Sequence, residues 1–175
     1  MRPIVVLIGP PGAGKSQVGR KLAKYLGAEF IDTDSRIVLE HGPIAEIFQT
    51  RGEPAFRAIE REVVAEALTH PAVVSLGGGA VMDTRTDRAL QGLRVALLTV
   101  SPEAVASRLT GRHRPLIEGG SPDDRLANWL RIAESRRRTY EALATRSWDT
   151  SLLSVTQVAR EIADWTQEDM AGTTN

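Results

Sequence analysis

The sequence is most constrained by a glycine-rich segment near its start, residues 9–16, which reads Gly-Pro-Pro-Gly-Ala-Gly-Lys-Ser. The segment fits the pattern G-x-x-x-x-G-K-[ST] at every fixed position. A continuous apolar run at residues 4–8, typical of a strand buried on both faces, precedes it, and apolar residues at helical spacing follow it over residues 15–26. A loop between a buried strand and a helix predicts an α/β fold that binds phosphate through backbone N–H groups and the helix N-terminus. A glycine-rich turn without function is disfavoured, because the motif and its flanking elements agree.

Two side chains of this loop have the chemistry of phosphoryl transfer. Lys15 can reach the β- and γ-phosphates of a nucleotide, and the hydroxyl of Ser16 can ligate Mg²⁺. The residues expected to bind nucleotide here are Gly12, Ala13, Gly14, Lys15, Ser16 and Gln17. The motif by itself does not separate a kinase from a GTPase, an ATPase motor or a nucleotide-binding module.

Composition narrows the classes of function. The chain has 175 residues, with 22 Lys and Arg against 22 Asp and Glu, and no Cys. The formal net charge of zero gives no general attraction to nucleic acid, and the absence of Cys excludes a thiolate nucleophile, a disulfide framework and a cysteine zinc site. The apolar run at residues 4–8 is too short for a signal peptide or a membrane span, so we expect a cytoplasmic protein without a membrane partner.

The rest of the chain alternates short apolar runs with longer helical patterns. Further strands are predicted near residues 29–31, 72–76, 95–100 and 147–149. Helices are predicted near residues 35–41, 43–50, 54–68, 86–91, 102–109, 123–143 and 154–166. This alternation predicts a parallel sheet with helices on both faces. We expect one domain over residues 1–166 and a frayed tail over residues 167–175.

A polar loop at about residues 111–124 interrupts the alternation. It contains Arg112, His113 and Arg114 among several glycines and prolines. Loops longer than the usual connection often serve as lids or binding loops, so we predict a mobile lid here.

Two aspartates, Asp32 and Asp34, end the second predicted strand. Side chains at i and i+2 of an extended segment point the same way, so both carboxylates can face the carboxyl edge of the sheet, where open α/β sheets bind ligands. One carboxylate could hold Mg²⁺ through water, and the other could accept a proton from an attacking hydroxyl. A helix cap plus a turn residue is the alternative interpretation, because a helical pattern starts at Ser35.

Taken together, these motifs resemble the shikimate kinases, which are small P-loop kinases of the nucleoside-monophosphate-kinase type. The resemblance runs from about residue 4 to about residue 160. Besides the phosphate loop and the aspartate pair, it rests on residues 56–60 (Phe-Arg-Ala-Ile-Glu), 75–81 (Ser-Leu-Gly-Gly-Gly-Ala-Val) and 114–116 (Arg-Pro-Leu), and on Arg136 with Tyr140. It implies a three-layer α/β/α kinase fold with a five-stranded parallel sheet in the order 2-3-1-4-5 and a lid. The implied reaction transfers the γ-phosphate of ATP to the 3-hydroxyl of shikimate, a step in aromatic amino acid biosynthesis.

The resemblance also implies roles for the residues around the acceptor. Asp32 would bind Mg²⁺ through water, and Asp34 would contact the substrate hydroxyls and act in catalysis. Arg57 would bind the substrate carboxylate. Glu60 lies three residues on along a helix and would orient that arginine without touching substrate. An exposed surface ion pair without function is the alternative for Arg57 and Glu60.

A run of three glycines would form the floor of the same site. Gly77, Gly78 and Gly79 follow the third predicted strand and are expected to bind substrate, with Gly78 offering its backbone. Glycines there permit a turn with positive φ and the close approach of a ligand. A plain loop is the alternative interpretation.

Three further arginines receive roles from the resemblance. Arg114 would be the lid arginine that acts on the nucleotide phosphates, where a cation stabilises the transferring phosphoryl group. Arg108 would stack near adenine, and Leu153 could pack on the base where the family often has a basic residue. Arg136 would be a second arginine for the substrate carboxylate. Arg136 could instead belong to a solvated run over residues 136–138. Arg137 could also compete with it for binding the substrate carboxylate.

The expected partners are therefore ATP and shikimate, with one Mg²⁺ per subunit held through Ser16 and Asp32, and the protein is expected to be a monomer that binds no nucleic acid. A gluconate kinase is the alternative enzyme, although its function would not require two arginines around a triple glycine. A nucleotide-binding regulatory module is the rival from another class. An intact set of functional residues argues against that module: Lys15, Ser16, Asp32, Asp34 and Arg114.

Overall fold

The computed structural model describes residues 1–108 and 121–171, and it contains one parallel sheet. The strands are β1 (Val5–Ile8), β2 (Glu29–Asp32), β3 (Ala72–Ser75), β4 (Val95–Thr99) and β5 (Arg146–Asp149). They pair in the order β2-β3-β1-β4-β5, and every neighbouring pair is parallel. The predicted five-stranded sheet and its strand order are confirmed.

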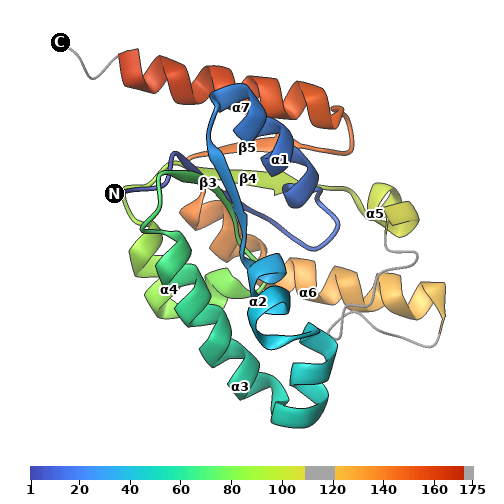
Figure 1. The fold of residues 1–175 in the computed structure, drawn as a ribbon. Helices are drawn as coiled ribbons and strands as arrows, with labels where there is room; N and C mark the ends of the chain where they lie inside the picture. The colour runs from blue at the N-terminus through green and yellow to red at the C-terminus, as the bar shows by residue number, and fades with distance from the viewer. Residues whose placement is uncertain (109–120, 172–175) are drawn as a thin grey trace.

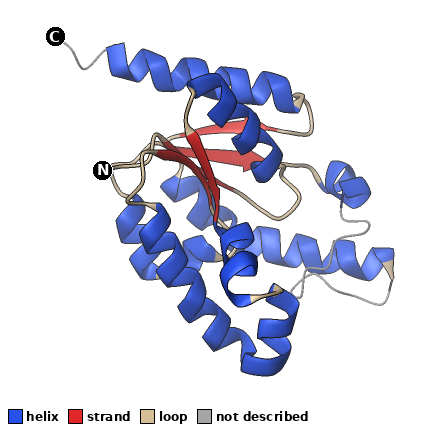
Figure 2. Cartoon of the chain, viewed as in Figure 1, coloured by secondary structure: helices blue, strands red, loops and turns tan. Residues whose placement is uncertain are grey.

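Helices cover both faces of this sheet (Figure 1). They are α1 (Lys15–Leu26), α2 (Thr33–His41), α3 (Ile44–Ala67), α4 (Thr84–Leu90), α5 (Pro102–Arg108), α6 (Pro122–Leu143) and α7 (Val155–Ala171), with a 3₁₀ turn, η1 (Ala80–Met82), before α4. Helices α1 and α7 lie together on one face, and α3, α4 and α6 lie on the other, so that the strands are enclosed between two helical layers (Figure 2).

The central strand shows why the sheet must be enclosed. Val5 and Leu7 pack into the core beneath α1 and α7, whereas Val6 and Ile8 pack into the core on the opposite face. All four side chains are at most 1% exposed. An alternating strand with one wet face would leave two of them in water, so the unbroken apolar run requires helices on both sides.

Helix boundaries differ from the sequence prediction where the backbone bends or a cap acts. The two patterns predicted at residues 43–50 and 54–68 merge into α3 across a kink at Gly52, whose φ of 81° and ψ of 167° are not helical. Helix α2 begins at Thr33 because Asp32 caps it by accepting a hydrogen bond from the N–H of Ser35 at 3.0 Å.

Two expectations about the ends of helices need correction. Helix α7 continues to Ala171, so a frayed tail from residue 167 is wrong for the first five of those residues. Trp165 packs against Trp148 on β5 and Thr166 is buried, so the apolar face of the helix persists to that point. Helix α6 begins at Pro122 behind a capping box of Ser121 and Asp124, so the last three residues of the predicted loop at 111–124 are helical. Residues 111–120 of that predicted lid lie outside the described residues, as does the tail at residues 172–175.

None of the helices within residues 1–108 and 121–171 combines the length and the apolar character that a membrane span requires.

Candidate active site

The carboxyl ends of β1, β2 and β3 open onto a cavity of about 450 Å³. Its walls come from the phosphate loop, from aspartates at the end of β2 and the start of α2, from the end of β3 and from the connection between β5 and α7. Many of the site residues predicted from the sequence line this cavity: Gly12, Ala13, Gly14, Lys15, Ser16, Gln17, Asp32, Asp34, Gly78, Arg108 and Leu153. Open parallel sheets bind their ligands at this edge, so one cavity gathers most of the predicted nucleotide site.

The phosphate loop has the backbone that its sequence predicts. Gly12 and Gly14 have φ values of 83° and 85°, a conformation that L side chains rarely adopt. Gly14 caps α1, which places the N-terminus of that helix at the cavity. The ammonium of Lys15 donates to the carbonyls of Gly9 at 2.7 Å and Pro10 at 3.2 Å, so it lies along the loop that it is expected to serve.

Asp32 combines the two interpretations that its sequence position left open. Its Oδ1 caps α2, while its Oδ2 accepts a hydrogen bond from the hydroxyl of Ser16. The capping and the metal-binding interpretations are therefore compatible, since each uses a different oxygen. The predicted metal ligands Ser16 and Asp32 meet in the cavity as a hydroxyl and a carboxylate.

Asp34 reaches the cavity by a route that differs from the predicted one. The chain is already helical at Thr33, so the i and i+2 alternation of a strand does not relate Asp34 to Asp32. Asp34 lies in the first turn of α2 and still lines the cavity. The two carboxylates therefore share a cavity because a helix begins there, and the argument from an extended segment is wrong.

The triple glycine packs directly against charged side chains. A Cβ built on Gly77 would lie 2.5 Å from Oδ1 of Asp34 and 3.0 Å from Oε1 of Glu60. A Cβ on Gly79 would lie 2.6 Å from Nη1 of Arg57. None of the three glycines has positive φ, so the predicted positive-φ turn is wrong. Glycine is needed here because side chains from α2 and α3 occupy the space of a Cβ.

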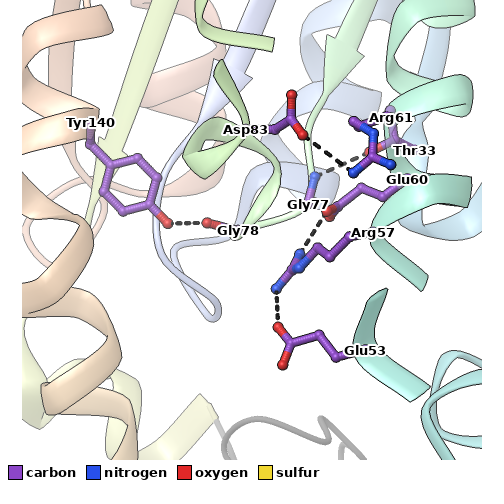
Figure 3. Close-up of polar contacts among 9 residues, drawn as sticks. All are labelled: Thr33, Glu53, Arg57, Glu60, Arg61, Gly77, Gly78, Asp83 and Tyr140. Atoms are coloured by element: carbon purple, nitrogen blue, oxygen red, sulfur yellow. Dashed lines mark hydrogen bonds and ion pairs between the residues drawn. The ribbon is translucent and has the colours of Figure 1, made fainter. Parts of the chain in front are cut away.

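Arg57, which is partly buried, pairs with the buried Glu60 on α3 beside these glycines (Figure 3). Nη1 of Arg57 lies 2.6 Å from Oε2 of Glu60, and Nη2 lies 3.2 Å from Oε1 of Glu53. Glu60 is only 4% exposed, which excludes the surface ion pair. Burial raises the pKa of Glu60, although the charge of Arg57 opposes this shift. The pKa of Arg57 is also raised: burial by itself would lower it, but the carboxylates of Glu60 and Glu53 outweigh that effect. Glu60 therefore holds one edge of the Arg57 guanidinium.

Arg136 comes to the same floor from α6. It is 9% exposed, and a Cβ on Gly78 would lie 3.5 Å from its Nη1. Arg137 and Arg138 are exposed, and Arg137 pairs with Glu134 at 2.7 Å on the surface. The solvated run therefore describes the two neighbours, and Arg136 is the member of the run that turns toward the triple glycine.

Comparison with known proteins decides the family. A family model described as shikimate kinase matches residues 11–167. A shikimate kinase of Corynebacterium efficiens is 42% identical over 170 residues, which cover 96% of this chain and 99% of that protein. A shikimate kinase of Thermobifida fusca is 47% identical over 165 residues, covering 93% and 94%. The chain belongs to the shikimate kinase family.

Solved structures agree with this family. A shikimate kinase from Acinetobacter baumannii in complex with shikimate matches with a TM-score of 0.87 and 30% identity, covering 100% of this chain and 96% of that one. A gluconokinase from Sinorhizobium meliloti matches with a TM-score of 0.58 and 22% identity, covering 98% and 97%, and shares the fold alone. The three-layer kinase fold predicted from sequence is confirmed.

Arg108 lies at the rim of the cavity rather than deep inside it. Its guanidinium donates to the carbonyl of Gly12 at 3.2 Å and to the carbonyl of Thr150 at 2.7 Å. It thereby joins the phosphate loop to the connection that follows β5. Leu153 lines the cavity, whereas Leu152 is 83% exposed. Arg114, which the family resemblance assigns to the lid, lies outside the described residues.

Three residues to which the sequence assigned no function form hydrogen bonds with the backbone of the loops in this shikimate kinase family site. The hydroxyl of buried Thr33 donates to the carbonyl of Ser75 at 3.2 Å and accepts from the N–H of Gly77 at 3.1 Å. Tyr140 donates to the carbonyl of Gly78 at 2.5 Å, on the opposite side of the glycine run from Arg57 (Figure 3). Burial raises the pKa of Tyr140 to about 12, so its hydroxyl keeps its proton.

The third residue is Trp129 on α6, whose indole N–H donates to the carbonyl of Pro11 at 2.7 Å. Helical spacing from Arg136 and Tyr140 could have marked Trp129 as buried on the same face of the helix. The partner of Trp129 is 118 residues away in the chain, and local sequence contains no signal for such a contact.

Proposed function

We propose that the protein is a shikimate kinase that transfers the γ-phosphate of ATP to the 3-hydroxyl of shikimate, giving ADP and shikimate 3-phosphate in aromatic amino acid biosynthesis. The observation that carries this proposal is the convergence of two arginines, the partly buried Arg57 and the buried Arg136, on the triple glycine next to the cavity of the phosphate loop. A site for a carboxylate needs forked cationic donors, and Arg57 and Arg136 offer two of them.

ATP would lie along the phosphate loop, with its phosphates on residues 12–17. The N-terminus of α1 and the ammonium of Lys15 suit the β- and γ-phosphates. Leu153 and Arg108 line the part of the cavity formed by the β5–α7 connection, which suits the base and ribose. Arg114 would supply the additional cation that stabilises the transferring phosphoryl group.

The residues present fit a hard divalent cation that arrives with the nucleotide. Ser16 and Asp32 offer oxygen ligands side by side, as Mg²⁺ prefers. Among residues 1–108 and 121–171, no group of three or more acidic or histidine side chains is placed to hold a metal. Phosphate oxygens and water would therefore complete the coordination, and a bound Mg²⁺, one per subunit, would neutralise charge on the phosphates.

Asp34 would act at the acceptor hydroxyl. It lines the nucleotide cavity and also packs against Gly77, so it lies where the two halves of the site meet. Its carboxylate can accept the proton of the attacking hydroxyl and aim that oxygen at phosphorus. Because phosphoryl transfer passes through a loose transition state, aiming is the larger part of this role. Glu60 would act through Arg57, which it holds beneath the substrate carboxylate.

The proposal extends to assembly and location. Most of the described residues given a role line one cavity, and we propose a monomer acting in the cytoplasm.

The test is ADP release measured with shikimate, with gluconate and with no acceptor. The proposal expects turnover that depends on shikimate and is absent with gluconate or without acceptor. Turnover that requires gluconate would support the rival kinase, and nucleotide binding without any acceptor-dependent turnover would support the regulatory module.

A further inference from the structure

Helix α6 presents one buried stripe to both loops of the site. Its buried residues are Trp129, Ile132, Arg136 and Tyr140, which recur at intervals of three and four and so share a face. Three of the four have polar groups, and each of these lies at a loop of the cavity: Trp129 at the phosphate loop, and Arg136 and Tyr140 at the triple glycine.

Trp129 is the member of the stripe that contacts the phosphate loop, and the proposed function gives it no role. It is 3% exposed and packs against Val105 of α5 and Ile132 of its own helix. Its hydrogen bond to the carbonyl of Pro11 is buried. A buried acceptor left without its donor is unfavourable, so this contact holds the loop in place.

Side chains hold four successive carbonyls of the phosphate loop. Lys15 donates to those of Gly9 and Pro10, Trp129 to that of Pro11, and Arg108 to that of Gly12. In a planar trans peptide the carbonyl and the following N–H point in opposite directions. Fixing the Pro11 carbonyl against Trp129 therefore directs the N–H of Gly12 away from α6, and Gly12 lines the nucleotide cavity.

The phosphate loop and the triple glycine are also in contact. A Cβ on Gly78 would lie 3.1 Å from Cδ of Pro11. Tyr140, three turns along α6 from Trp129, donates to the carbonyl of that same glycine. One rigid helix thus holds one carbonyl in each loop, with the Arg136 guanidinium between the two points.

We infer that Trp129 is a positioning residue for phosphoryl transfer: its indole N–H fixes the Pro11–Gly12 peptide toward the nucleotide phosphates and, through α6, sets the phosphate loop against the acceptor loop. This inference rests on the proposed function for its kinetic consequences but not for nucleotide binding. It assigns the N–H, rather than the bulk of the ring, as the group that acts on the site.

The decisive experiment replaces Trp129 by 3-benzothienylalanine, in which sulfur replaces the N–H of the ring and the shape is nearly unchanged. We expect the affinity for ADP, measured by calorimetry, to fall about ten-fold, as does kcat/KM for ATP, since an unpaired carbonyl lets the peptide turn. The KM for shikimate should stay within about two-fold. The same replacement at Trp165, which packs against Trp148 away from the cavity, is the matched control and should leave both substrates unaffected.

Two further variants separate positioning from packing. Trp129→Phe should lower the affinity for ADP as the analogue does, and it should also lower the melting temperature. Tyr140→Phe, which removes the other donor, should raise the KM for shikimate about ten-fold while ADP binds normally.

An analogue at position 129 that binds ADP as the parent does, or that lowers only the melting temperature, would overturn the inference. Because ADP affinity needs no acceptor, this readout stands even if shikimate is not phosphorylated, so failure of the proposed function would be recognised separately.

Discussion

The phosphate loop and the triple-glycine loop both depend on glycine, but for opposite reasons. In the phosphate loop, Gly12 and Gly14 have positive φ, and a Cβ on Gly14 would meet nothing within 4 Å. In the triple glycine the backbone is ordinary, and a Cβ on Gly79 would collide with Arg57. Gly12 and Gly14 are therefore needed for backbone shape, whereas Gly77 and Gly79 are needed because charged side chains occupy the adjacent space. Gly9, at the start of the phosphate loop, combines a positive φ with a close approach to the backbone of Leu98.

The two loops also differ in what surrounds them. The phosphate loop is one continuous segment that offers N–H groups, and its chemistry belongs to nearly any nucleotide. The acceptor floor is assembled from α2, α3, α6 and the segment after β3, with ionised groups from three helices. The phosphate-binding N–H groups therefore come from one continuous segment, although distant elements complete the nucleotide cavity, whereas the acceptor side is assembled entirely by the tertiary structure.

The largest expected effect is on the nucleotide side. Lys15→Met should lower kcat about 10²–10³-fold, because it removes a cation that stabilises the transferring phosphoryl group. Steady-state ADP release measures the change. Lys21→Met is the matched control, since Lys21 donates to Thr156 on α7 at 2.6 Å, and it should change kcat less than two-fold. Near-normal turnover of the Lys15 variant would defeat the assignment.

The next effect is on the acceptor side. Arg57→Lys and Arg136→Lys should each lower kcat/KM for shikimate about ten- to hundred-fold, because an ammonium cannot replace a forked contact with a carboxylate. The KM for ATP should change far less. The exposed Arg137, changed to Lys in the same way, is the control and should be neutral. If the Arg57 and Arg136 variants alter only the ATP parameters, the carboxylate lies elsewhere.

A pair of glycine variants tests the comparison directly. Gly14→Ala forces a left-handed backbone on an L residue at about 1–2 kcal/mol, so it should weaken ADP about ten-fold and spare shikimate. Gly79→Ala displaces the Arg57 guanidinium, so it should raise the KM for shikimate by a similar factor and spare ADP. Calorimetry with ADP and kinetics with shikimate supply the two readouts. Equal effects of either variant on both ligands would remove the distinction between the loops.

The smallest effect concerns stability and pH. Burial raises the pKa of Glu60 in the folded protein above its ordinary value of 4.5. Between pH 4.5 and the raised pKa, the Glu60 carboxyl is therefore protonated more fully in the folded protein than in the unfolded chain. The contribution of Glu60 to stability should therefore be fully present below pH 4.5 and be lost as pH rises through the raised pKa. Glu60→Gln should flatten this part of the profile in urea unfolding.

Glu53→Gln is the matched control for that measurement, because Glu53 contacts the same arginine from a half-exposed position. It should leave the slope of stability against pH unchanged. A profile that is equally steep in the parent and in Glu60→Gln would show that the Glu60 carboxyl is not the responsible group.

Local sequence determined the parts of this protein that depend on nearest neighbours in the chain. The apolar run of β1 required two covering layers, and the fixed positions of the phosphate loop required a strand before it and a helix after it. The strand order and the roles of Arg57, Glu60 and Arg136 came from resemblance to a family, because no periodicity specifies which strands become neighbours.

Tertiary structure decided what the chain brings together from a distance. Only the fold shows that Asp32 caps a helix and meets Ser16 at once, or that the triple glycine avoids charged side chains rather than adopting positive φ. Trp129 and Pro11 are 118 residues apart, and their hydrogen bond exists because α6 crosses behind the phosphate loop. Sequence patterns report the period of each element, whereas contacts between elements depend on how the elements pack, and it is those contacts that place the acceptor site beside the nucleotide.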